Sequence, residues 1–308
     1  MQWPPELSGE DALRVYWWLL VLAALGAAAC GRGADILLFS PLQEGPQEAS
    51  PTPGVEQAPV PSQRLQELSQ QVQALLADYP GQVSFVALDA ASGQGIAINW
   101  DEPFIAASVI KVFTMLTVLR DVEEGLYSLD DVWEDLHLLM GYSDNEANAR
   151  LTNLVGLAHI NELMRSLGLE NSSYNLWPGV PETYGDATEN YVTAHDLARA
   201  LLALYRGDVF RDERTRDLAL SLMSPLLEVD QLILVRYLPE GVRVAHKTGV
   251  IPPDDHYPSV LHDVGIVFPP QGEPYVVVFL SQGNADHTAA YDLGAELSLL
   301  AYQAFATA

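Results

Sequence analysis

Strand-like runs stand near both ends of this chain and enclose a long block of helical patterns. Two apolar runs, 82–89 and 95–100, are separated by a turn signal, and three more, 242–248, 260–268 and 275–280, come late. Strands of one sheet must be neighbours in space, so the two groups have to meet and the helices between them form an insertion. The sequence therefore predicts an α/β fold with a sheet lobe built from both ends and an inserted helical lobe.

Apolar stripes with helical spacing support this division. Leu65, Leu68 and Val72 lie on one face of a predicted helix at 64–78. Thr193 and Asp196 form a capping box and Gly207 follows the last apolar residue, which predicts a helix over 193–205. We expect the other helices at 108–125, 132–140, 144–155, 157–167, 212–223 and 288–305.

The first 62 residues differ from the rest. In residues 1–30, Arg14 is followed by an apolar run that ends in small residues and the lone Cys30. Its length suits a signal peptide or a membrane anchor, and the small residues favour lipidation of Cys30 over an uncleaved anchor. Residues 31–62, rich in Pro, Gln and Glu, predict an extended linker. We expect an extracytoplasmic, membrane-anchored protein.

A single catalytic domain is expected at 63–308. Its α/β lobe would comprise 63–105 and 225–308, and its helical lobe 106–224. The formal charge of -26, with 41 acidic residues, argues against a nucleic-acid partner. The seven histidines show no metal-ligand spacing and there is one cysteine, so we expect no metal site and no disulfide within the chain.

Lysine is used at two positions only. Of 15 basic residues, Lys111 and Lys247 are the lysines and the other 13 are arginines. Arginine serves equally well on a solvated surface, but only a buried lysine can lose its proton and act as a base. Ser108 stands three residues before Lys111, on the same face of a helix. An N-terminal capping serine followed by a surface lysine is the alternative; the restricted use of lysine favours a nucleophile and its base.

Three short motifs contain both lysines. In order, they are Ser108-x-x-Lys111, Ser143-Asp144-Asn145 and Lys247-Thr248-Gly249. From about residue 64 to the C-terminus the chain resembles the class A β-lactamase-like serine hydrolases. The resemblance implies an antiparallel sheet flanked by terminal helices, an inserted all-helical lobe, and a serine nucleophile that needs neither metal nor cofactor.

The resemblance also implies roles for these residues. Ser108 would be the nucleophile and Lys111 the amine that takes its proton. Ser143 would pass a proton to the leaving nitrogen, with Lys247 beside it, and Asn145 would hold the substrate amide. Ser143 has a structural alternative, because Ser143-x-x-Glu146 is also a capping box. Both roles of Ser143 can hold together, and Asp144 is expected to stabilise the loop.

The third motif is expected to form one wall of the cleft. The resemblance assigns Thr248 to the substrate carboxylate, and Gly249 would let the substrate lie close along the strand. The backbone N–H groups of Val250 and Ser108 would form the oxyanion hole.

Two features depart from the family pattern. The 35 residues between Ser108 and Ser143 are fewer than usual, so a wall of the cleft is expected to be trimmed. The Glu-x-x-Leu-Asn loop that carries the deacylating glutamate is missing, and Glu182 is the nearest substitute, with Asp186 and Glu189 behind it.

The sequence thus predicts an exported serine hydrolase that forms an acyl-enzyme on Ser108 and hydrolyses the β-lactam amide, with slow deacylation. A D,D-peptidase-like or other acyl hydrolase acting on cell-wall peptides is the first alternative. A non-catalytic wall-binding module is the second, and the intact motifs argue against it. We expect a monomer whose partners are a small-molecule β-lactam or cell-wall peptide and, through the N-terminus, the membrane.

Overall fold

The computed structural model describes residues 36–39, 62–177, 189–253 and 258–306. The predicted leader with Cys30, most of the predicted linker, and Glu182 and Asp186 lie outside the described residues. Within the described part, no helix is both long and apolar enough to cross a bilayer. No group of three or more His, Cys, Asp or Glu side chains there is arranged to hold a metal ion.

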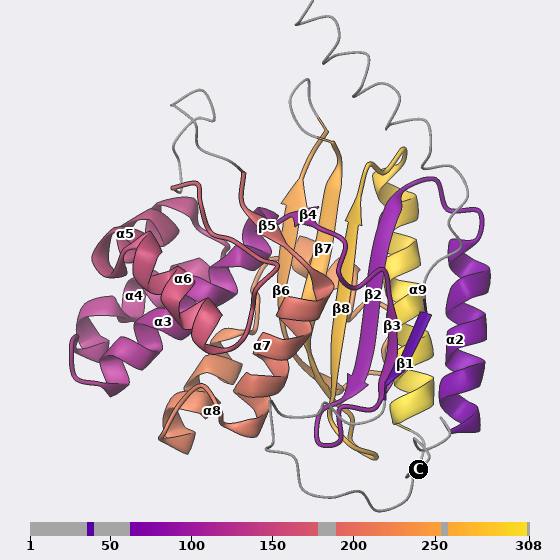
Figure 1. The fold of residues 1–308 in the computed structure, drawn as a ribbon, viewed down its shortest axis with the longest axis horizontal. Coiled ribbons are helices and arrows are strands. Elements are labelled where there is room, and N and C mark those ends of the chain that lie inside the picture. Colours follow the sequence, from indigo (N-terminus) through magenta and orange to yellow (C-terminus); the bar gives the residue numbers. More distant parts are fainter. Residues whose placement is uncertain (1–35, 40–61, 178–188, 254–257, 307–308) are drawn as a thin grey trace, which may run out of the picture. The chain divides into compact units, whose positions relative to one another are not determined.

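A six-stranded antiparallel sheet forms the α/β lobe (Figure 1). The strand order is β1-β3-β2-β8-β7-β6, so strands from both ends of the chain meet at the β2–β8 pair. The central strands are buried on both faces almost throughout, so most of their residues are apolar and do not alternate with polar ones. The strands are β1 (Ile36–Phe39), β2 (Gln82–Asp89), β3 (Gly95–Ile98), β6 (Arg243–Ile251), β7 (Val260–Phe268) and β8 (Tyr275–Gln282).

Two strand predictions are corrected. The linker prediction is wrong for residues 36–39, an Ile-Leu-Leu-Phe run that pairs with β3 as an edge strand. Strand β6 continues to Ile251 beyond the predicted end at Thr248, because pairing with β7 runs on to Ile251↔Val260. The extension places Gly249 and Val250 inside a regular strand.

The two terminal helices, α2 (Gln63–Leu76) and α9 (His287–Phe305), cover one face of this sheet (Figure 1). Leu68 and Val72 of α2 and Leu297 of α9 share a buried cluster with Phe85 and Phe279 of the sheet. On the other face lies α7 (Ala194–Arg206), whose predicted N-cap and stop residue are confirmed. The predicted capping box is only half formed, because Asp196 Oδ2 accepts from Asn171 N and Thr193 N donates to Ser172 Oγ. The Thr193 side chain accepts from Asp196 N, and Gly207 has φ 85°.

The remaining helices lie beyond the β6 edge of the sheet (Figure 1). They surround α3, of whose 13 residues ten are buried. A two-stranded sheet, β4 (Phe104–Ile105) with β5 (Tyr191–Val192), leads into this lobe. The elements of this lobe are the 3₁₀ turn η2 (Ala107–Ile110), α3 (Lys111–Glu123), α4 (Leu129–Gly141), α5 (Asn145–Val155), α6 (Leu157–Ser166) and α8 (Glu213–Leu222). The 3₁₀ turn η3 (Glu228–Leu232) contacts α9 of the sheet lobe.

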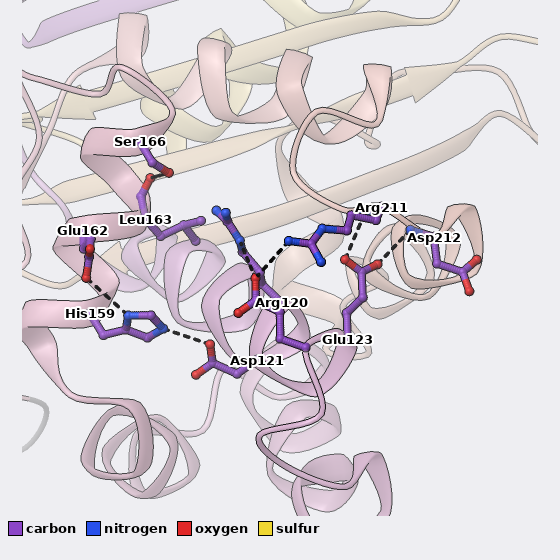
Figure 2. A network of polar contacts seen from close by, with 10 residues as sticks. Arg120, Asp121, Glu123, His159, Glu162, Leu163, Ser166, Arg211 and Asp212 are labelled. Carbon is purple, nitrogen blue, oxygen red and sulfur yellow. Dashed lines mark hydrogen bonds and ion pairs between the residues drawn. The ribbon is translucent and has the colours of Figure 1, made fainter.

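The C-terminal end of α3 is held by polar contacts to α6 and to the loop before α8 (Figure 2). Buried Asp121 accepts from His159 at 2.8 Å, and the Glu123 carboxylate accepts from the N–H groups of Arg211 and Asp212 at 2.9 and 2.8 Å. The other end of α3 begins with Lys111, directly after the 3₁₀ turn that contains Ser108. The predicted fold class, an antiparallel sheet with terminal helices and an inserted helical lobe, is confirmed.

Candidate active site

Ser108 lies in a 3₁₀ turn and not in the α-helix that the spacing predicted. Residues 107–110 form η2, and Lys111 is the first residue of α3. Ala107, just before the serine, has φ 44°, a conformation that costs free energy for a residue with a Cβ. Ser108 is partly exposed while Lys111 is buried. The turn thus keeps the hydroxyl accessible and the amine enclosed.

The segment that leads into Ser108 is fixed by three hydrogen bonds, two with the sheet lobe and one with Asn190, the residue before β5. Ile105 N donates to Gln282 Oε1 at 3.2 Å, and Ala106 N donates to Asn190 O at 2.8 Å. His262, fully buried, donates from Nε2 to Ile105 O at 2.8 Å while its Nδ1 accepts from Ser281 N at 3.1 Å. Burial lowers the pKa of His262 to about 4, so it stays neutral and keeps this bonding pattern.

The Lys111 amine reaches the second motif. Its Nζ donates to Ser143 O at 2.5 Å, to Ser143 Oγ at 3.2 Å and to Asn145 Oδ1 at 2.7 Å. It forms no hydrogen bond to Ser108 among the described residues, although the two lie one 3₁₀ turn apart. Lys111 therefore joins the nucleophile turn to the Ser143 loop.

Lys247 approaches Ser143 from the other side. Its side chain is 0% exposed, and Nζ donates to Ser143 Oγ at 3.0 Å and to Thr248 O at 2.8 Å. The Ser143 hydroxyl therefore accepts from two amines while its own proton remains free to be donated. This arrangement suits a hydroxyl that delivers a proton into the cleft.

Both lysines have a lowered pKa. The pKa of Lys111 falls to about 7, first because burial disfavours the charged form and then because Lys247 carries a like charge; Asp144 and Asp230 oppose the shift. Burial lowers the pKa of Lys247 to about 8, against the attraction of Asp230 and Asp263. At neutral pH the site therefore holds an amine that can accept a proton.

The predicted capping role of Ser143 is wrong. Asp144 is the N-cap of α5, and its carboxylate accepts from Ala147 N at 2.6 Å. Ser143 stands directly before this N-cap and has φ 55°, a strained conformation for a residue with a Cβ. Asp144 thus supports the loop, and Ser143 and Asn145 are left to face the lysines.

Strand β6 is the edge strand nearest the helical lobe, and its outer side faces Ser108. His246 N donates to Met223 O at 2.7 Å, away from β7. Backbone groups alternate along a strand, so the N–H groups of Thr248 and Val250 point to the same outer side. A Cβ on Gly249 would lie 3.0 Å from Ser108 N. Only glycine lets the strand and the nucleophile turn approach so closely.

A buried acidic network behind β6 was missed by the sequence reasoning. The Thr248 hydroxyl donates to the Asp230 carboxylate, and both residues are buried. His246 Nδ1 bonds Asp263 Oδ1 at 2.8 Å, and the other oxygen of Asp263 accepts from Leu234 N at 3.1 Å. No motif marks Asp230, because its partner is 18 residues away and a single aspartate in an acidic chain carries no signal.

The structure places Glu189 but not the other two deacylation candidates. Glu189 Oε1 accepts from Asn190 N at 2.7 Å, and its carbonyl accepts from the Asn175 amide at 3.4 Å. Glu182 and Asp186 lie outside the described residues, so their roles stay predictions.

The chain is similar in sequence to known β-lactamases. The sequence pattern of the β-lactamase enzyme family matches residues 67–135 and 131–305. A β-lactamase of Bacillus licheniformis is 28% identical over 228 residues, covering 66% of this chain and 72% of the relative. A second, from Amycolatopsis lactamdurans, is 23% identical over 269 residues, covering 77% of this chain and 80% of the relative.

Solved structures share the fold. The β-lactamase of Sphaerobacter thermophilus has a TM-score of 0.67 at 26% identity and covers 78% of this chain and 97% of that one. A class A β-lactamase of Bacteroides cellulosilyticus has a TM-score of 0.70 at 23% identity, covering 78% and 98%. Because the family pattern matches more than half of the chain, the chain belongs to the β-lactamase enzyme family and is a class A β-lactamase-like serine hydrolase.

Proposed function

We propose that this protein opens the amide bond of β-lactams by forming an acyl-enzyme on Ser108 and releases the product slowly. The observation that carries the proposal is the position of Ser143 Oγ, 3.2 Å from Lys111 Nζ and 3.0 Å from Lys247 Nζ. Two amines with lowered pKa values beside one hydroxyl form a proton relay next to a partly exposed serine.

Acylation begins with the neutral form of Lys111. The amine takes the proton of the Ser108 hydroxyl, whose oxygen forms a bond to the carbonyl carbon. The N–H groups of Ser108 and Val250 stabilise the oxyanion. Collapse of this intermediate breaks the C–N bond, and the leaving nitrogen takes the Ser143 proton. Ser143 then recovers a proton from a lysine, so protons and bonds balance.

Asn145 and the outer edge of β6 would position the substrate. The Asn145 amide is oriented by Lys111, which donates to its Oδ1 at 2.7 Å, and Asn145 itself is exposed. Its N–H₂ group can therefore donate to a substrate carbonyl. Thr248 and Gly249 provide the wall along which the substrate lies.

Mass spectrometry after incubation with a penicillin tests the proposal. We expect a mass increase of one penicillin per chain, located on Ser108, and its loss in Ser108→Ala. Thr117→Ala is a suitable control because the Thr117 hydroxyl is buried and donates within α3 to Phe113 O at 2.8 Å. Label that persists in Ser108→Ala would refute Ser108 as the nucleophile.

We also propose that the enzyme is exported and tethered to the membrane through residues 1–30, with a lipid on Cys30. The apolar run before Cys30 and the Pro-rich linker after it support this placement. We expect a mature N-terminus at Cys30 and recovery in the membrane fraction. Cys30→Ser should leave the chain uncleaved or soluble, and an N-terminus found elsewhere would refute lipidation.

A further inference from the structure

We propose that His262 and Gln282 are positioning residues for acylation, because their side chains hold the backbone of Ile105, three residues before Ser108. They act on the placement of the nucleophile and not on the substrate. The inference rests on the proposed function, since it takes acylation of Ser108 as the step whose rate they control.

Ile105 is held through both of its backbone groups. Its N–H donates to Gln282 Oε1 at 3.2 Å, and its carbonyl accepts from His262 Nε2 at 2.8 Å. His262 lies within β7 and Gln282 is the last residue of the neighbouring strand β8. Ile105 itself belongs to the other, two-stranded sheet, so these two side chains tie it to the large one.

The His262 ring is a fixed donor for Ile105. Ser281 N can only donate, so His262 Nδ1, 3.1 Å away, accepts and the ring proton is on Nε2. His262 is 0% exposed, so little water can replace a lost bond at this place. The Phe104 ring packs against the imidazole at an angle of 85°, with the ring centroids 6.0 Å apart. The donor therefore has one position and one direction.

The turn that carries Ser108 needs such a hold. Ala107, two residues after Ile105, has φ 44°, and a strained conformation persists only where the surrounding structure fixes it. The turn η2 packs against β6 and β7. Gly249, which pairs with His262 in the sheet, is so close that an added Cβ would lie 3.0 Å from Ser108 N. Release of Ile105 would therefore let Ser108 shift against β6, which carries the expected oxyanion donor.

Two exchanges at His262 separate its two hydrogen bonds in the intact protein. Glutamine carries an amide nitrogen about as far from the backbone as Nε2, so His262→Gln keeps the donor to Ile105 O. Asparagine places its amide oxygen near the position of Nδ1, so His262→Asn keeps the acceptor for Ser281 N and loses that donor. Both variants remove a buried ring and should lower the melting temperature.

The readout is the rate constant of penicillin acylation at saturation, together with the half-saturating concentration. In His262→Asn we expect the rate constant to fall roughly ten- to a hundredfold and the half-saturating concentration to stay within about twofold of wild type. The reason is that the placement of Ser108 changes and the groups that bind substrate do not. In His262→Gln we expect a rate constant within about threefold of wild type. Partial unfolding lowers the amount of label and not this rate constant.

Gln282→Met tests the other bond at a half-buried residue, because it removes the acceptor for Ile105 N. We expect the rate constant to fall about three- to tenfold, again without a change in the half-saturating concentration. Ser84→Ala is the control, because buried Ser84 donates to Ile98 O at 3.0 Å in the same sheet. It should lower the melting temperature and acylate at the wild-type rate.

Equal rate constants in the two His262 variants, or a wild-type rate constant in Gln282→Met, would overturn this inference alone. The Gln282→Met result decides where His262→Asn yields too little folded protein. If the wild-type protein is not labelled on Ser108, the proposed function fails, and this inference fails with it.

Discussion

Lys247 Nζ donates to Ser143 Oγ at 3.0 Å although 104 residues separate the two in the chain. The contact joins the edge strand of the sheet lobe to the loop before α5, so the site exists only when the two lobes are packed together. Lys111 Nζ reaches the same oxygen at 3.2 Å from α3. Two cations that share one acceptor repel each other, and this repulsion is the second cause of the lowered pKa of Lys111.

Replacing either lysine by arginine should cripple acylation although the positive charge is kept. Arginine does not lose its proton near neutral pH, and its planar guanidinium group is larger than an ammonium group. For Lys111→Arg and Lys247→Arg we expect acylation rate constants at least about a hundredfold below wild type, measured by mass spectrometry against time. Arg150→Lys, the reverse exchange in an exposed pair with Asp135, is the control and should acylate normally. Wild-type rates in both lysine variants would contradict their roles.

The pKa values of the two lysines predict a narrow pH optimum for acylation. The base form of Lys111 increases as pH rises through about 7, so the rate should rise there. The charged form of Lys247 decreases as pH rises through about 8, so the rate should then fall. Because the two amines interact, the apparent pKa values of the two limbs of the pH profile describe the pair and not the single lysines.

The measurement is the acylation rate constant from pH 5 to 10 at constant ionic strength. Removing the charge of one lysine should move the limb of the other, so Lys247→Met should shift the acid limb to higher pH by relieving the repulsion of Lys111. A rate that does not change between pH 6 and 9 would show that neither amine titrates in the rate-determining step.

The three motifs could be located from the sequence because each one is a short run of neighbouring residues, and the catalytic roles assigned to them stay predictions. Ser108, Lys111, Ser143 and Lys247 were all found from short spacings, and the structure brings the three motifs together. What the sequence could not indicate are contacts between distant residues. Asp230 and His262 act through Thr248 O–H and Ile105 O, and neither partner can be identified from periodicity or spacing.

Element boundaries were missed where tertiary contacts override local signals. The 3₁₀ turn at Ser108 continues into α3 without a break in the apolar pattern, so the pattern predicted one helix. Ser143-x-x-Glu146 has the spacing of a capping box, but the adjacent Asp144 caps the helix and the lysines hold Ser143 outside it. Strand β1 was missed because its four apolar residues precede a Pro-rich segment.

Gly249→Ala should slow acylation more than it destabilises the fold. The new Cβ would lie 3.0 Å from Ser108 N and 3.1 Å from Val109 N, so the nucleophile turn would have to shift by a few tenths of an ångström. A shift of this kind moves Ser108 relative to the oxyanion donor of Val250, and we expect a loss of roughly ten- to a hundredfold in the acylation rate.

A glycine on the next strand serves as control. A Cβ on Gly265 would lie 2.5 Å from Ala245 O, so Gly265→Ala should lower the melting temperature without touching Ser108. Acylation per folded molecule should stay near wild type in Gly265→Ala. Equal losses of acylation in the two variants would mean that the Gly249 effect is only general destabilisation.

Turnover separates a β-lactamase from related enzymes whose acyl-enzyme is hydrolysed slowly. It depends on a general base that activates a water molecule for attack on the acyl-enzyme. That base must lie within hydrogen-bond reach of a water molecule next to the ester of Ser108. The usual Glu-x-x-Leu-Asn loop is missing, and the candidates are Glu182, Lys111 itself, or Asp186 and Glu189. A base misplaced by about 1 Å costs on the order of a hundredfold.

We therefore predict fast acylation by penicillins followed by slow deacylation, seen as a stoichiometric burst of product and a low steady rate. If Glu182 activates the water, Glu182→Gln should lengthen the acyl lifetime further and leave the burst amplitude intact, because the acylation groups Ser108, Lys111 and Ser143 are unchanged. Glu189→Gln is the matched exchange in the same stretch, at a side chain that bonds Asn190 N, and should have the smaller effect. Fast multiple turnover that Glu182→Gln does not alter would show that another residue activates the water.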